Sequence, residues 1–232
     1  MAAAIAASCS FANAQSCSGL SSKTCRQTQG CEWDRFARSC VVGCPANVFQ
    51  STSPDYGVID EFEFNLWLDL DLSRSDVQTF YSNAYSRWTS IIKSDSNNGG
   101  STSTSGLNLW AECPAGIPSI LDDLYICGRD TCIDGPGNVL GSAGPQYIWT
   151  ATGLPATGIM EFDSEDIPNL LDLWEVVILH EMGHVLGIGS SSGWDDAIDT
   201  NNDFTGPNAT DVWQNQWGCL GLPPIETDGG AG

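Results

Sequence analysis

The residues best suited to chemistry are two histidines and a glutamate in one short stretch, His180-Glu181-Met182-Gly183-His184. On a helix, residues i and i+4 lie on the same face, so the two imidazoles can hold one Zn²⁺ ion through bonds of roughly 2.0–2.1 Å. Glu181 then lies beside the metal, where it can act as a general base on water. The spacing predicts two zinc ligands, His180 and His184, and one catalytic residue, Glu181.

An accidental pairing of histidines is the alternative explanation. The chain has only two histidines in 232 residues, and both lie in this motif. Such an accident, with the glutamate also in place, has a probability of roughly one in a thousand or less. Residues 170–186 are apolar nearly all round, as in a buried helix. Polar groups in such a helix are costly unless a metal ion compensates them, which favours the metal site.

A catalytic zinc site normally has three protein ligands and one open position. The chain offers no third histidine. Gly187 and Gly189 predict that the helix ends there and that the chain turns, so that a ligand could return from elsewhere. The aspartates within 195–199 have no motif support. Glu226 is bracketed by Pro-Pro and Gly-Gly pairs, which argue against a ligand-bearing helix.

The motif and its neighbours resemble the metzincin zinc endopeptidases. Residues 180–187 match the start of the pattern H-E-x-x-H-x-x-G-x-x-H, but its last histidine falls at Ser190. A distant third histidine marks the leishmanolysin group, and the flanking segments resemble leishmanolysin-like proteins. The resemblance runs from about residue 62 to the C-terminus and includes the segments Ile133–Gly141, Gly158–Asp163, Phe204–Ala209 and Glu226–Gly230.

The resemblance implies an α+β fold, a metzincin-type zincin catalytic domain with a twisted mixed sheet and an active-site helix. It also implies a third zinc-binding histidine beyond Gly232 and a methionine turn beneath the metal. The methionines present, Met1, Met160 and Met182, do not supply that turn. We therefore expect residues 56–232 to be a partial metallopeptidase domain with an incomplete C-terminal subdomain and weak zinc binding.

The amino-acid composition limits the cellular compartment and the classes of binding partner that are expected. The net charge is −21, and Arg129 is the last basic residue, which disfavours nucleic acid and anionic lipid as partners. Ten cysteines indicate an oxidising compartment. Residues 1–14 are expected to be a signal peptide ending in Ala12-Asn13-Ala14, with an alanine-rich tail as the alternative. No apolar run predicts a membrane span, and peripheral association with a cell surface stays open.

Five cysteines within 28 residues predict a small disulfide module over residues 15–45, followed by a linker over 46–55. Removal of Cys9 with the signal peptide leaves nine cysteines, so one is expected to be free or to pair outside the chain. The cysteines of the module are Cys17, Cys25, Cys31, Cys40 and Cys44.

Hydrophobic periodicity predicts the elements that position the motif. Ser73 and Asp76 form a capping-box-like start for the first helix. Asp199–Asp203 begins like a calcium loop, but positions six and twelve lack the required residues, so a capped, solvated loop is favoured. The expected elements are strands at 60–72, 120–127 and 157–163, helices at 77–93 and 170–186, and loops at 97–106 and 134–145.

These observations lead to a secreted zinc endopeptidase that hydrolyses protein or peptide substrates as the first hypothesis. A catalytically inactive, protease-like binding or adhesion protein is the alternative, because a third ligand is missing. The intact Glu181 argues against that alternative, since a binding protein has no need of the base. A gluzincin-type peptidase with an unrecognised acidic ligand is a further alternative.

Overall fold

The computed structural model describes residues 19–25, 31–34, 39–42, 47–60, 63–96, 100–110 and 113–225. The chain divides into two compact units, Met1–Ala46 and Asn47–Gly232. This boundary coincides with the end of the predicted cysteine-rich module. The predicted signal peptide, residues 1–14, lies outside the described residues.

The N-terminal unit contains a short helix and a hairpin. Helix α1 (Ser22–Cys25) precedes strands β1 (Cys31–Asp34) and β2 (Ser39–Val42), which pair antiparallel. The predicted bridges among the five cysteines of this unit fall on side chains outside the described part of the chain.

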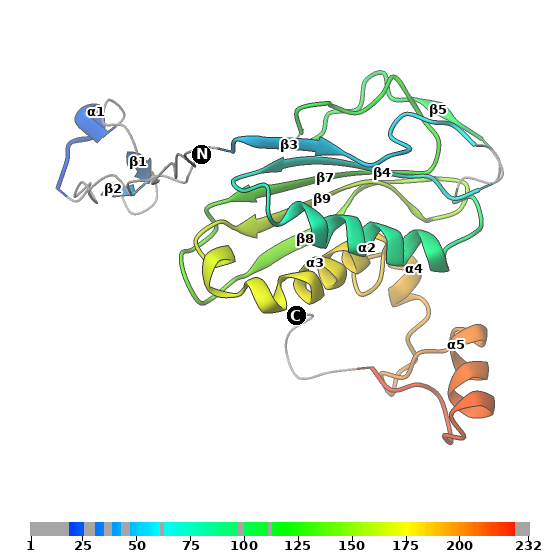
Figure 1. The fold of residues 1–232 in the computed structure, drawn as a ribbon. Coiled ribbons are helices and arrows are strands. Elements are labelled where there is room, and N and C mark those ends of the chain that lie inside the picture. The colour runs from blue at the N-terminus through cyan, green and yellow to red at the C-terminus, as the bar shows by residue number, and fades with distance from the viewer. Residues whose placement is uncertain are drawn as a thin grey trace, which may run out of the picture. The chain divides into compact units, whose positions relative to one another are not determined.

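The second unit is built on a five-stranded mixed sheet, and α-helices pack on this sheet (Figure 1). The three central strands run parallel to one another, and each edge strand is antiparallel to its neighbour. This confirms the α+β class. In spatial order the strands are β3 (Phe49–Thr52), β4 (Leu66–Leu72), β7 (Leu124–Thr131), β9 (Pro155–Asp163) and β8 (Gly141–Ile148).

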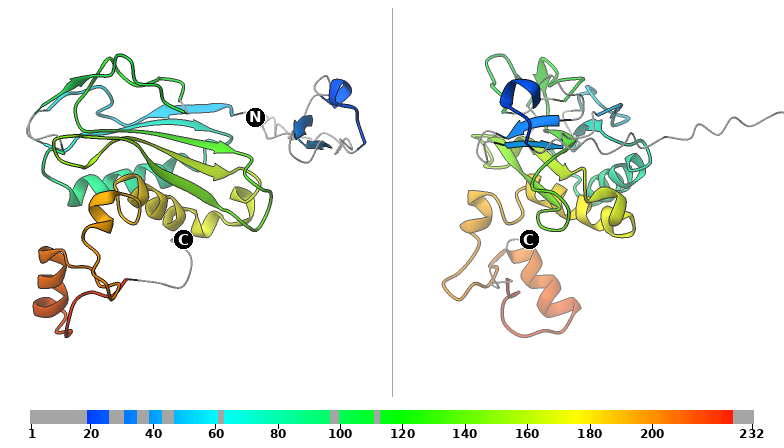
Figure 2. Two further views of the ribbon diagram at one scale, coloured as in Figure 1. Left: turned by 180° about the vertical axis from the view of Figure 1, so that it is seen from behind. Right: turned by 90° about the vertical axis from the view of Figure 1, so that its left-hand side faces the viewer.

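Two helices, α2 (Gln78–Ile91) and α3 (Leu171–Val185), cover one face of the sheet side by side, as both views show (Figures 1 and 2). The alternating leucines of β4 point to this face and share one core with buried residues of both helices. The strand predicted at 60–72 and the helices predicted at 77–93 and 170–186 are confirmed, although the strand begins at Leu66 rather than at residue 60. The buried residues of this core include Leu66, Leu68, Leu70, Leu72, Tyr81, Met160, Phe162, Trp174, Ile178 and Met182.

A second, smaller core covers the opposite face of the sheet. Trp67 and Tyr125 are buried there against a long connection that includes β5 (Thr102–Ser103) and β6 (Ile120–Leu121). A disulfide joins Cys113 in this connection to Cys127 in β7. Strand β4 is therefore buried on both faces. Cys132 is also disulfide-bonded, and Cys219 has a free thiol.

Three segments predicted as irregular are partly strands. The predicted loop over 97–106 contains β5, which pairs antiparallel with β6. The predicted linker over 46–55 contains β3, which pairs with β4 from Phe49 to Thr52. The predicted loop over 134–145 ends at Gly141, where β8 begins to pair with β9. All three strands are short or rich in glycine and proline, so hydrogen bonds to their pairing partners stabilise them more than their own strand propensities do. The linker and loop predictions are wrong at these positions.

The predicted capping box at the start of α2 is also wrong. The N–H and the hydroxyl of Ser73 both donate to the Asp130 carboxylate, at 2.7 and 2.8 Å, and Asp76 pairs with Arg74. The helix begins later, at Gln78, and its N-cap Val77 provides no side-chain cap. Ser73 therefore ties the end of β4 to β7 instead of starting the helix.

The chain beyond α3 is loosely packed. It forms the short helices α4 (Ser192–Asp195) and α5 (Pro207–Asp211) and a π-helical turn, η2 (Val212–Gln216). No residue from 188 to 225 is buried. No helix in the described part of the chain is both long enough and apolar enough to cross a lipid bilayer.

Asp163, at the end of β9, organises the connection that leads to β8. Its carboxylate accepts backbone hydrogen bonds from Ile133, Asp134, Gly135 and Glu165 at 2.9–3.1 Å. Burial alone would raise the pKa of Asp163, but these four donors outweigh it and lower the pKa. The ionised carboxylate is therefore the form that the fold favours.

We expect Asp163→Asn to lower the free energy of unfolding by about 2 kcal/mol at pH 7. Both carboxylate oxygens of Asp163 accept hydrogen bonds, whereas the amide of asparagine has only one oxygen that can accept them. A lowered folded pKa means that this contribution is present above the unfolded pKa of about 3.9 and is lost as the pH falls through the folded pKa. Urea unfolding of both proteins from pH 7 to pH 3 measures it. Asp134→Asn, an exposed change in the same loop, serves as the control. A difference that stays constant to pH 3 would contradict the role of the charge.

Candidate metal centre

Helix α3 presents opposite faces to the core and to the surface. Trp174, Ile178, Met182 and Val185 are completely buried, at spacings of four, four and three residues. The motif histidines lie on another face, where His180 is exposed and His184 is half-buried. The apolar face thus fixes the helix against the sheet, and the two imidazoles stay accessible.

The two imidazoles converge. The Nε2 atoms of His180 and His184 lie 3.0 Å apart, and the ring planes are perpendicular, with centroids 4.6 Å apart. Two nitrogens at this separation can both reach one zinc ion through bonds of roughly 2.0–2.1 Å. The residues therefore fit zinc as two of its ligands, as the sequence predicts.

The end of α3 orients the second histidine. Gly187, at φ +101°, follows the helix, its N–H donates to the His184 carbonyl, and the N–H of Ile188 donates to the Gly183 carbonyl, both at 3.0 Å. These two bonds form a Schellman motif, which confirms the predicted glycine stop. The turn brings the Ile188 carbonyl oxygen within 2.8 Å of His184 Nδ1.

This contact selects a tautomer. A carbonyl oxygen only accepts hydrogen bonds, so the proton of neutral His184 is assigned to Nδ1 and the lone pair to Nε2. Histidines that bind metals are commonly held in this way by a backbone carbonyl. The Ile188 carbonyl therefore leaves the lone pair of His184 on Nε2, the atom that faces His180.

Glu181 points away from solvent. It is 7 % exposed, and its Cγ lies 3.2 Å from where a Cβ on Gly141 would stand. Burial raises the pKa of Glu181, while the charges of His184 and His180 act in the opposite direction. A carboxylate with a raised pKa is a stronger base than an ordinary glutamate, which suits it to accepting a proton.

Two glycines let the helix approach its neighbours. A Cβ on Gly158, in β9, would lie 2.3 Å from Val185 Cγ1 and 2.8 Å from the Gly144 carbonyl oxygen. A Cβ on Gly183 would lie 3.3 Å from the Trp88 ring, and Trp88 Nε1 donates to the Leu179 carbonyl at 3.2 Å. The sheet and α2 therefore fix the position of the motif.

Two nearby candidates for a third ligand are engaged elsewhere. Ser190, at the position of the last metzincin histidine, donates its hydroxyl to the His184 backbone carbonyl. Asp199 accepts the N–H groups of Asn201 and Asp203 at 2.8 and 3.0 Å. Within the described ranges, no three His, Cys, Asp or Glu side chains gather in a group that could hold a metal ion.

The loop at 199–203 matches the favoured interpretation of a capped turn. The backbone N–H groups of Asp203 and Asn201 hold the pKa of Asp199 below its usual value. Asn202 adopts a positive φ of 64°, as asparagine tolerates in turns. The Asp199 carboxylate is thus occupied by its own loop.

Two contacts in the site could not be predicted from the sequence. The Ile188 contact is made by a backbone oxygen, which no residue type signals; the spacing of Gly187 and Gly189 is the one available hint of the turn. The proximity of Gly141 to Glu181 depends on the pairing of β8 with β9. Each of these contacts joins a motif residue to a residue outside the motif, so the motif alone does not predict it.

Comparison with protein-family models and with curated proteins finds no match to this chain.

Proposed function

We propose that the chain is a secreted zinc endopeptidase of the leishmanolysin-like metzincin type. The observation that carries the proposal is the 3.0 Å approach of His180 Nε2 to His184 Nε2 beside the buried Glu181. The mixed sheet with a zinc-motif helix packed on it supports the metzincin-type architecture. The disulfide between Cys113 and Cys127 supports an oxidising, extracellular environment.

Different residues of the chain would have different roles in peptide hydrolysis. His180 and His184 would hold zinc, which when bound supplies a Lewis acid that polarises the scissile carbonyl group. Glu181 accepts a proton from the attacking water and delivers it to the leaving amine as the C–N bond breaks. The Ile188 carbonyl keeps the lone pair of His184 on Nε2.

The sheet offers a place for an extended peptide. Strand β8 is an edge strand, and its first residue, Gly141, lies near Glu181, since a Cβ built there would stand 3.2 Å from Glu181 Cγ. A peptide that adds to this edge as a further strand would pass close to the general base. A protein or peptide substrate is therefore proposed.

A second candidate function is a non-catalytic protein that retains the protease scaffold. One observation favours it: the described residues bring two, not three, metal-ligating side chains together. In the first candidate, the third ligand comes from outside the described residues.

We expect zinc binding to be weak and to depend on both imidazoles. Two ligands are fewer than the three or four of a usual zinc site, so much of a binding free energy of order 10 kcal/mol is missing. His180→Ala or His184→Ala should weaken binding by about a hundredfold, because each removes half of the described ligands. Competition with a chromogenic chelator measures the affinity.

Ser190→Ala is the matched control for zinc binding, because Ser190 stands where the metzincin pattern has its last histidine. The control should retain the affinity of the unmodified chain. Zinc binding that persists when both imidazoles are removed would refute the site. Zinc binding without any peptide cleavage would favour the non-catalytic candidate.

A further inference from the structure

The C-terminal part of the second unit is acidic, like the rest of the chain. Residues 190–225 contain five acidic residues and no lysine, arginine or histidine. No side chain in this segment is buried. The acidic residues are Asp195, Asp196, Asp199, Asp203 and Asp211. The segment therefore attracts cations.

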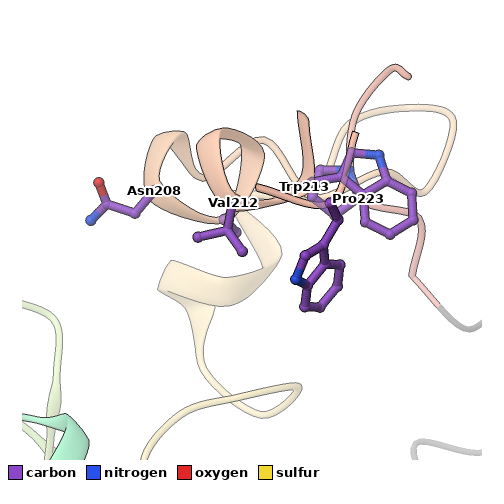
Figure 3. Close-up of a pocket in the computed structure, with 6 residues that line it drawn as sticks. Asn208, Val212, Trp213 and Pro223 are labelled. Atoms are coloured by element: carbon purple, nitrogen blue, oxygen red, sulfur yellow. The ribbon is translucent and has the colours of Figure 1, made fainter. Parts of the chain in front are cut away.

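This acidic segment contains an apolar pocket of about 450 Å³ (Figure 3). This volume lies within the range of about 300–1,000 Å³ that is usual for small-molecule sites. Its lining is almost wholly apolar, and Asn208 contributes the one polar side chain. The lining residues are Asn208, Ala209, Val212, Trp213, Trp217 and Pro223.

Two of the side chains that line the pocket are indole rings. The centroids of Trp213 and Trp217 lie 6.1 Å apart, with the ring planes at 63°. Trp213 is held by a hydrogen bond from its Nε1 to the Leu220 carbonyl at 3.2 Å. Trp217 is 69 % exposed. Two inclined aromatic faces in an acidic segment favour a positively charged ligand through cation–π attraction.

The lining also selects the kind of cation. An ammonium or guanidinium group carries N–H donors, and each donor that leaves water needs a new acceptor. The pocket offers the side-chain oxygen of Asn208 and little else. A quaternary ammonium group has no N–H donor, so its methyl groups can contact the indole faces without losing hydrogen bonds.

We propose that the pocket between Trp213 and Trp217 binds a small quaternary ammonium compound of the choline type. This site is separate from the His180–His184 pair and does not depend on peptidase activity. A phosphate on the ligand lowers affinity, because the surrounding segment is acidic throughout.

Saturation-transfer NMR on the methyl signal of choline, with the full chain, tests the proposal. Choline should show transfer and saturable binding. Its neutral isostere 3,3-dimethylbutan-1-ol should bind at least about tenfold more weakly than choline, since it lacks the positive charge that cation–π attraction requires. Phosphocholine should also bind more weakly than choline. Equal binding of choline and the neutral isostere would overturn the proposal.

Trp217→Ala should weaken choline binding by about tenfold, because it removes one aromatic wall. Trp110→Ala is the matched control: Trp110 is 67 % exposed and does not line the pocket. It should leave choline binding unchanged. Trp213→Phe, which retains a ring but loses the hydrogen bond to Leu220, should weaken binding by a smaller factor. An absence of choline binding, or equal losses in Trp217→Ala and Trp110→Ala, would refute the site.

Discussion

For the proposed peptidase, we expect Glu181→Gln to lower kcat for peptide hydrolysis in the presence of zinc by about a thousandfold, while zinc affinity stays unchanged. The amide cannot accept the proton of water, and general-base catalysis contributes about a hundred- to ten-thousandfold. Because glutamine has nearly the same shape and no charge to desolvate, the contact with Gly141 is retained and stability should not fall. Steady-state cleavage of a quenched fluorescent peptide and chelator competition measure the two effects.

Glu175→Gln is the matched control for this prediction. Glu175 lies on the same helix, is exposed, and accepts a hydrogen bond from Asn83 at 3.0 Å. The control should keep the full peptidase rate. Cleavage at an undiminished rate by Glu181→Gln would remove Glu181 from the mechanism.

Gly158→Ala should lower the free energy of unfolding by about 3 kcal/mol, which corresponds to a fall in Tm of about 6–12 °C. The added methyl group would stand 2.3 Å from Val185 Cγ1 and 2.8 Å from the Gly144 carbonyl oxygen. Relieving the contact with Val185 requires α3 to shift away from the sheet, and relieving the contact with the Gly144 oxygen disturbs the pairing of β8 with β9. Thermal unfolding monitored by circular dichroism measures the loss.

Gly144→Ala is the control for the close approach at Gly158. It lies on the neighbouring strand β8, and a Cβ there meets nothing within 4 Å. We expect a change below about 1 kcal/mol. Equal losses in the two variants would show that glycine content, rather than the contact with Val185, governs stability.

Local patterns predicted much of the fold. The alternating leucines of β4 and the apolar spacing of α3 each encode one buried face, so strand and helix follow from short stretches of sequence. The histidine pair follows from the same logic, because residues four apart on a helix are neighbours. Helix α2 was likewise predicted, with bounds that differ by one or two residues.

Contacts between distant segments account for what the sequence did not predict. Strand β8 begins in Gly141-Ser-Ala-Gly-Pro145, whose composition is typical of a loop, and exists because β9 supplies its hydrogen bonds. Ser73 was expected to cap a helix, but Asp130, far along the chain, competes for its hydroxyl. The burial of Glu181 likewise arises from β8 and cannot be read from the motif alone.

The placement of the motif on one helix has a consequence for the order in which the site is assembled. The two imidazoles need only one helical turn to meet, so bringing them together costs little loop-closure entropy. The pocket of Glu181 needs β8 and β9, whose pairing closes a much longer stretch of chain. A folding chain can therefore bring the two imidazoles together before the surroundings of the proposed general base are complete, and a bound cation would then favour conformations in which α3 is already formed.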